Sequence, residues 1–86
     1  MIEFPKSVMV SRLDDEMVLM DTEGGHYFSL NEIATEMVDL LMNGTSIENS
    51  AELLVGKYLV SVDQVVEDLN RLITELQTRG LLTVTS

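Results

Sequence analysis

The feature that most constrains the fold is a change of periodicity at residues 24–31. Before this segment the apolar residues form short β-type runs, and after it they recur at helical spacing. Gly24 and Gly25 supply the backbone freedom that a turn requires, and Asn31 is a favourable helix N-cap. The chain is therefore expected to place its strands first and its helices afterwards, which is an α+β arrangement.

Two runs near the N-terminus predict a β-hairpin. Val8–Leu13 is rich in β-branched and apolar residues, and Met17–Met20 is a second apolar run. Residues 14–16, Asp-Asp-Glu, provide a short acidic turn between them. Because both faces of the second run are apolar, we expect it to be buried on two sides.

A third strand is expected at His26–Leu30, after a turn at residues 22–25. Side chains alternate along a strand, so Phe28 and Leu30 share one face and Tyr27 lies on the other. We expect Phe28 and Leu30 to anchor this strand to the core. The three runs together predict an antiparallel three-stranded sheet.

Three helices are predicted in the second part of the chain. The first ends at Asn43–Gly44, where glycine permits the left-handed cap conformation. The second opens with a capping box at Thr45–Glu48 and runs to about Tyr58. The third opens with another capping box at Ser61–Gln64 and ends near Arg79.

The third helix has the clearest amphipathic pattern. A wheel gives a central apolar stripe, two residues that widen it on one side, and a polar residue at the border on that side. The central stripe is Val65, Leu69, Leu72 and Leu76, the residues that widen it are Val66 and Ile73, and the border residue is Asn70. Residues 81–84 then form a short extended tail that is expected to pack beneath a single domain spanning residues 1–86.

Composition excludes several classes of function. The chain has 86 residues, no cysteine and one histidine, so neither a disulfide framework nor a zinc site of the usual ligands is expected. A formal net charge of −10 disfavours nucleic acid, whose affinity comes from Lys and Arg on phosphates. No segment has the length of a membrane span or the blocks of a signal peptide, which predicts a cytoplasmic protein without a membrane partner.

Catalytic groups are equally scarce. His26 is the only imidazole, and no serine lies in a nucleophile-elbow context. Gly24–Gly25 precedes a strand, whereas phosphate loops lead into a helix N-terminus, so a turn is the better interpretation. The acidic pair at Asp14–Asp15 is interpreted as solvated surface, while Glu67–Asp68, beside the apolar stripe, is either surface or a contact for a basic partner. No cofactor or metal is expected.

A small sheet with free edges favours a binding function. An edge strand presents unpaired N–H and C=O groups on which another peptide can add as a strand. Tyr27 either contacts such a peptide or covers the sheet, and its direction stays open. Asn70 is either a surface residue or a peptide contact, since its amide both donates and accepts. We therefore expect a noncatalytic binding module.

Five segments in order resemble the PqqD-like family, whose members recognise precursor peptides of ribosomally made, modified natural products. The resemblance extends from about Val8 to Val84. Its segments are Val18–Asp21, Gly25–Asn31, Leu40–Thr45, Val65–Leu69 and Leu76–Leu82.

The resemblance implies a winged helix-turn-helix with an N-terminal three-stranded sheet. It also implies that the leader segment of a precursor peptide adds antiparallel to the third strand, in the cleft beside the third helix, for presentation to a partner enzyme. The peptide-binding residues that it implies are Gly25, His26, Tyr27, Phe28, Ser29, Leu30, Val66, Asp68, Leu69, Asn70, Arg71 and Ile73.

The likeness is greatest to the standalone recognition protein of lasso-peptide pathways, because residues 21–28 lack the Pro-containing segment that cofactor-biosynthesis members tend to carry. That resemblance implies a separate leader peptidase as partner. A PqqD-type peptide chaperone for a radical enzyme is the alternative. A winged-helix transcriptional regulator is the alternative from another class, although the third helix carries only Arg71 and Arg79 against four acids. A small catalytic or metal-dependent domain comes third.

Overall fold

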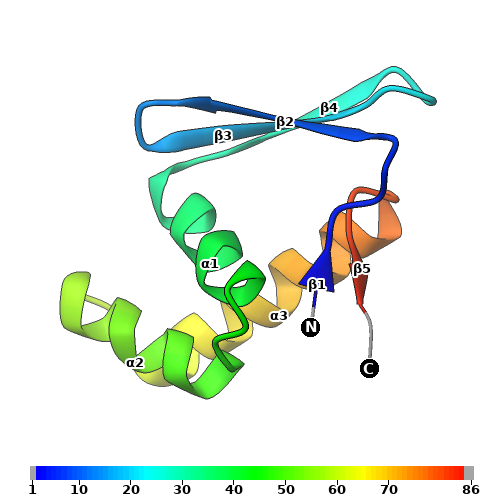
Figure 1. Cartoon of the computed structure of the whole chain (residues 1–86). Coiled ribbons are helices and arrows are strands. Elements are labelled where there is room, and N and C mark those ends of the chain that lie inside the picture. The colour runs from blue at the N-terminus through cyan, green and yellow to red at the C-terminus, as the bar shows by residue number, and fades with distance from the viewer. Residues whose placement is uncertain (1, 85–86) are drawn as a thin grey trace.

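The strands precede the helices as predicted, and the sheet lies to one side of all three helices (Figure 1). The computed structural model describes residues 2–84. The sequence predicted an extended tail, but not that the first and last strands pair in a two-stranded ribbon. The elements are β1 (Ile2–Glu3), β2 (Val8–Leu13), β3 (Glu16–Asp21), β4 (His26–Leu30), α1 (Glu32–Met42), α2 (Ile47–Lys57), α3 (Val62–Thr78) and β5 (Thr83–Val84).

The main sheet is antiparallel with strand order β2-β3-β4. The turn between β2 and β3 is one residue shorter than predicted: Leu13 pairs with Glu16, so only Asp14 and Asp15 lie in the turn. Asp14 takes a positive φ of 55°, which two-residue hairpin turns require and which Asp tolerates. The turn before β4 ends at Gly25, with φ 72°.

The prediction that the second run is buried on both faces is wrong. On β3, Met17 and Leu19 are 1% and 0% exposed, whereas Met20 on the opposite face is 45% exposed. All the helices lie against one face of the sheet, so nothing in the described chain covers the other (Figure 1). The outer face therefore keeps apolar side chains in contact with water.

The helix caps follow the sequence, with one shift. Asn31 Oδ1 accepts a hydrogen bond from the Ala34 amide, as expected for the cap of α1. The second helix is capped by Ser46, whose hydroxyl accepts from the Asn49 amide, and not by Thr45. The Thr45 amide instead donates to the Leu40 carbonyl at 3.0 Å, because it completes the cap of the preceding helix.

The chain ends meet in the β1-β5 ribbon. Ile2 pairs with Val84 and Glu3 with Thr83, which confirms an extended tail, and Leu81 and Leu82 just before it are buried in the core. One hydrophobic core joins the ribbon, the sheet and the three helices. Its buried members are Ile2, Val8, Met17, Leu19, Leu30, Met37, Val38, Leu41, Ala51, Leu54, Val65, Leu69, Leu76, Leu81 and Leu82.

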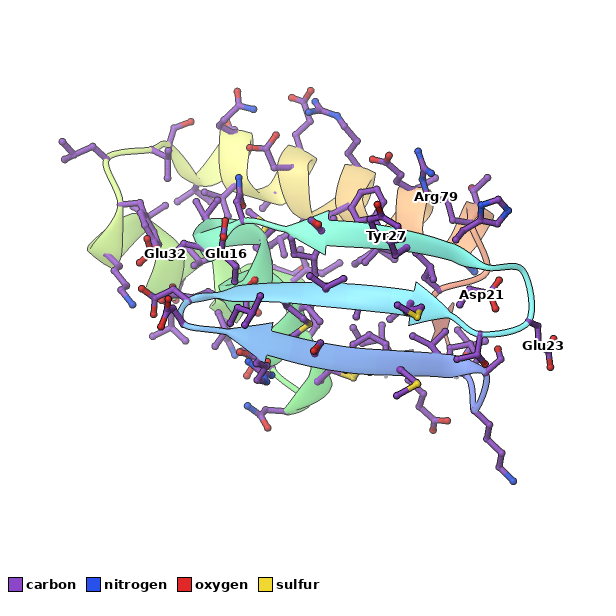
Figure 2. All side chains as sticks on the ribbon, turned by 90° about the horizontal axis from the view of Figure 1, so that it is seen from above. Glu16, Asp21, Glu23, Tyr27, Glu32 and Arg79 are labelled. Atoms are coloured by element: carbon purple, nitrogen blue, oxygen red, sulfur yellow. The ribbon has the colours of Figure 1, made fainter. Side chains whose placement is uncertain are left out.

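Two packing relations position β4. Helix α1 packs against β3 and β4, and α2 packs against α1 and α3. Seen from above the sheet, α3 runs along the β4 side and not the β2 side (Figure 2). No helix in residues 2–84 is long and apolar enough to cross a bilayer.

Candidate peptide-binding site

Strand β4 has a partner on one side only. It pairs with β3 and forms one edge of the three-stranded sheet, with β2 at the other edge. An edge of this kind carries a row of backbone donors and acceptors directed away from the sheet. Since α3 lies beside β4, this row faces the space between the strand and the helix (Figure 2).

The register identifies which backbone groups face outward. The Thr22 amide donates to the Ser7 carbonyl at 2.8 Å. Because backbone direction alternates along a strand, Thr22 and every second residue before it in β3 direct their N–H and C=O groups to β2. The intervening residues of β3 therefore bond β4, where their partners are His26, Phe28 and Leu30. By the same alternation, the N–H and C=O groups of Tyr27 and Ser29 point to the free edge.

Two hollows lie on the α3 side of β4, one near each end of the strand, and together with the free edge they are here called the groove. The hollow at the start of β4, here called the Arg79 hollow, is about 250 Å³ and is lined by His26, Tyr27, Arg79 and Leu81. The hollow at the end of β4, here called the Leu72 hollow, is about 210 Å³. It is lined by Asn31, Ile33, Ala34 and Met37 of the first helix region and by Asp68, Arg71, Leu72 and Glu75 of α3.

Arg79, the C-cap residue of α3, reaches the side chain of Phe28 on β4. Its Cζ atom is 5.0 Å from the centroid of the Phe28 ring, which is a cation–π contact. Its Nη2 atom also lies 3.3 Å from Glu75 Oε1. Arg79 and Glu75 are both at the surface, so their ion pair is weak enough to rearrange when a peptide enters the groove.

Charged side chains of α3 lie at and beside the Leu72 hollow. Arg71 lies 2.9 Å from Glu67 Oε1 and 3.3 Å from Asp68 Oδ1. These are exposed pairs along one helix, each contributing a few tenths of a kcal/mol, about 0.3 to 0.5. A guest peptide with either charge can replace one member of the network at little cost.

The β4 residues predicted for the site lie together along the groove, but their side chains point to opposite faces of the sheet. Leu30 is buried and Phe28 is partly buried, so both anchor the strand as predicted. Tyr27 is 70% exposed on the outer face and stands at the rim of the Arg79 hollow (Figure 2). Gly25 ends the preceding turn, while His26 and Ser29 are exposed.

The outer face carries an apolar row that continues to the edge of the sheet. Tyr27 pairs with Met20, and Met20 pairs with Met9 on the next strand. The three side chains are therefore neighbours, and each is more than 40% exposed. This outer row, Met9, Met20 and Tyr27, is directed away from the helices and the groove.

The α3 residues predicted for the site are not all brought to β4. Asp68 and Arg71 line the Leu72 hollow. Leu69 is 0% exposed and belongs to the core, so it offers no surface to a peptide. Asn70 and Ile73 line a separate hollow with Ile2 and Val84, on the flank of α3 that faces the β1-β5 ribbon.

Val66 lies on that same flank. The Asn70 side-chain amide donates to the Val66 carbonyl at 3.0 Å, which directs it along the helix. The structure therefore separates Val66, Asn70 and Ile73 from β4. A helical wheel gives two borders to an apolar stripe and does not say which border meets the sheet.

Sequence reasoning missed the residues of the opposite border. Leu72 and Glu75 of α3 and its C-cap residue Arg79 line the two hollows, although only Leu72 was singled out, as a core residue. Their signal was present in the spacing, because positions 68, 72, 75 and 79 recur at helical intervals and so share one face of the helix. Ile33 and Met37 join them from α1.

The groove lies within a region that matches a known family. Residues 16–82 match the family model described as Coenzyme PQQ synthesis protein D (PqqD). The chain belongs to the PqqD family. The matched residues include β4 and α3, which form both walls of the groove, so the PqqD match covers the whole candidate site.

Two solved structures are similar over almost the whole PqqD-like fold. One is described as lasso peptide synthetase B1 complexed with the leader peptide; it has a TM-score of 0.89 and 29% identity, with 96% of this chain and 98% of that chain covered. The other is described as TbiB1 in complex with the TbiA(beta) leader peptide; its TM-score is 0.84, its identity is 26%, and 98% of each chain is covered. No curated protein matches the sequence.

The similarity confirms the predicted α+β fold, with an N-terminal three-stranded antiparallel sheet followed by three helices. It also confirms the resemblance to the PqqD-like recognition elements. Within residues 2–84, no group of three or more His, Cys, Asp or Glu side chains is placed to hold a metal ion.

Proposed function

We propose that this chain is a noncatalytic binding protein for the leader segment of a ribosomally made precursor peptide. The leader adds to β4 as an antiparallel strand and lies in the groove beside α3. The observation that carries the proposal is the free edge of β4, whose outward backbone groups face a groove walled by α3. Two similar proteins are described in complex with a leader peptide, which supports the same occupant here.

The groove offers enough interaction for a useful affinity. The N–H and C=O groups of Tyr27 and Ser29 allow four backbone hydrogen bonds, each worth about 0.5 to 1.5 kcal/mol net. Two apolar side chains buried in the Arg79 and Leu72 hollows add about 1.5 to 3 kcal/mol each. Ordering the peptide offsets part of this, so a Kd of about micromolar or below is expected.

The register of the added strand assigns its side chains to two faces. Leader residues opposite His26, Phe28 and Leu30 point toward α3, and those between them point outward. Two inward residues spaced four apart reach the two hollows at the ends of β4. The inward residue between them meets Arg79, which lies over Phe28.

The bound leader is delivered to a separate processing enzyme, which we propose to be a leader peptidase of lasso-peptide biosynthesis. An added strand widens the sheet and extends the outer row Met9, Met20 and Tyr27 with its own outward side chains. Exposed apolar groups gathered on one face of a monomer favour a protein partner. The enzyme would then contact the leader and this chain together. A radical enzyme, as in the PqqD-type alternative, would use the same face.

A transcriptional role is the competing function on this fold. The charge of −10 repels DNA, and both arginines of the α3 region are paired with acids of the same helix. Arg71 and Arg79 are thus poorly placed to bind phosphates, which makes the peptide the better ligand.

The two functions are separated by one titration. The synthetic leader encoded beside this gene, a scrambled leader of equal composition, and a DNA duplex are each labelled with fluorescein and titrated with the protein at moderate salt. We expect saturable binding of the leader only. Binding of the duplex but not the leader, or equal binding of leader and scrambled leader, would overturn the proposal.

A further inference from the structure

A third hollow lies beyond the end of β4. It is about 400 Å³ and is here called the Leu59 hollow. One wall is the start of α1, with Asn31, Glu32 and Ile33, and the other is the loop between α2 and α3, with Tyr58, Leu59 and Val60. It shares Asn31 and Ile33 with the Leu72 hollow, so it continues the groove past the last residue of β4.

The apolar wall of this hollow is uncovered. Leu59 is fully exposed in its loop, and Ile33 is only partly buried. A single exposed leucine is common on protein surfaces, but here it stands opposite another apolar side chain across a hollow that adjoins the groove. The wall can therefore take up the apolar part of a peptide that leaves the groove.

One acidic residue, Glu32, lines the Leu59 hollow. Lys57 forms an ion pair with Glu36, which is the main cause of its raised pKa, and the charge of the nearby Glu32 adds a smaller effect. Glu32 itself has no ion-pair partner within 4.0 Å in residues 2–84. Glu32 is labelled in Figure 2 at the end of the sheet near the loop between α2 and α3. The hydroxyl of Tyr58 is buried without a hydrogen-bond partner among the described residues. Burial, followed by the negative charges of Glu32 and Glu36, raises the pKa of Tyr58.

We propose that the Leu59 hollow binds one Lys or Arg side chain of the leader peptide, from the residues just before the added strand. The inference rests on the proposed function, because an antiparallel strand on β4 carries its N-terminal flank past Leu30 and Asn31 into this hollow. The hydrocarbon stem of the basic side chain lies across Ile33 and Leu59, and its charged end meets Glu32.

A basic side chain fits this hollow better than the other residue types. An aliphatic side chain would cover the apolar wall and leave Glu32 unpaired. A short polar side chain could meet Glu32 but would leave the apolar wall uncovered. Lys and Arg carry an apolar stem and a cationic end in one side chain. The strongly acidic chain also favours a basic peptide during approach.

The test is a double-mutant cycle with one substitution in the peptide and one in the protein. The fluorescein-labelled leader encoded beside this gene is compared with the same leader in which the basic residue before the strand is replaced by Gln. Each is titrated against the wild type, Glu32→Gln and Leu59→Ser by fluorescence anisotropy. The Gln peptide should bind the wild type about fivefold to tenfold more weakly. Against Glu32→Gln that difference should fall below about twofold.

Two variants serve as controls. Asp63→Asn also removes an acid from the first turn of a helix, and Leu53→Ser also removes an exposed leucine, but neither residue lines the hollow. Both should keep the full difference between the two peptides. Circular dichroism melting curves confirm that every variant is folded.

The outcomes distinguish the two proposals. If neither peptide binds the wild type, the proposed function fails and this inference fails with it. If the leader binds but contains no Lys or Arg before the strand, or if the difference between the peptides is the same in Glu32→Gln as in the wild type, this inference alone is overturned.

Discussion

Replacing Ser29 by proline tests strand addition directly. The register directs the Ser29 amide to the free edge of β4, whereas the ladder with β3 uses Phe28 and Leu30. Proline lacks that amide and is tolerated on edge strands when the lost N–H faced solvent. Ser29→Pro should therefore keep the sheet and remove one of the four backbone groups offered to the leader.

The cost follows from what the leader loses. One backbone hydrogen bond contributes about 0.5 to 1.5 kcal/mol, and a leader carbonyl left without a donor in the groove costs about 1 to 3 kcal/mol. The combined effect is taken as about 2 kcal/mol, which is an affinity loss of about 30-fold. The proline ring also stands where the leader backbone approaches, and this acts in the same direction.

Val10→Pro is the matched control. Val10 is on β2, the other edge of the sheet, and the same alternation turns its amide away from β3. Binding of the labelled leader is measured by fluorescence anisotropy, and folding is measured by circular dichroism. Val10→Pro should bind as the wild type does. If folded Ser29→Pro binds within about twofold of the wild type, or if Val10→Pro loses as much affinity, strand addition to β4 is refuted.

Three further predictions concern the surface, the core and a cap. Tyr27→Ala should weaken leader binding by less than about 1 kcal/mol, because its side chain is at the rim, yet slow leader removal in an assay with the processing enzyme; equal rates would contradict the role of the outer row. Leu19→Ala should lower the free energy of unfolding in urea by about 2 to 5 kcal/mol, and Met20→Ala on the outer face by less than about 1 kcal/mol. Ser46→Ala should cost about 1 kcal/mol in thermal unfolding, while Thr45→Ala should be near neutral; the reverse order would place the cap at Thr45.

The order of the elements could be predicted because each signal is local. Alternation, turn residues and N-caps act within a few positions, so the strand at His26–Leu30 and the cap at Asn31 follow from the sequence. The cap of α2 was misplaced by one residue for a reason that is only partly local. Thr45 has the right side chain, but its backbone is already engaged by the end of α1.

Burial required information that the local pattern lacks. The run Met17–Met20 is apolar on both faces, and an apolar residue on a strand is equally compatible with a core and with a partner surface. Met20 is exposed because the three helices share one side of the sheet. The same arrangement places the side chain of Tyr27 outside while its backbone faces the groove. The direction of Tyr27 could thus be decided only by the tertiary fold.

The flank of α3 was the other feature that the sequence left undetermined, and two adjacent residues test it. Leu72 lines the groove beside β4, and Ile73 lines the hollow beneath the β1-β5 ribbon. Both are partly buried apolar residues of one helix, so Leu72→Ala and Ile73→Ala should lower the unfolding free energy by similar amounts. Their effects on leader binding should differ. Leu72→Ala should weaken it by about 1 kcal/mol or more, roughly fivefold or above, and Ile73→Ala by less than about twofold. Binding is measured on folded protein at low temperature. A larger loss of leader affinity in Ile73→Ala than in Leu72→Ala would show that the leader binds on the flank of α3 that faces the ribbon and not beside β4.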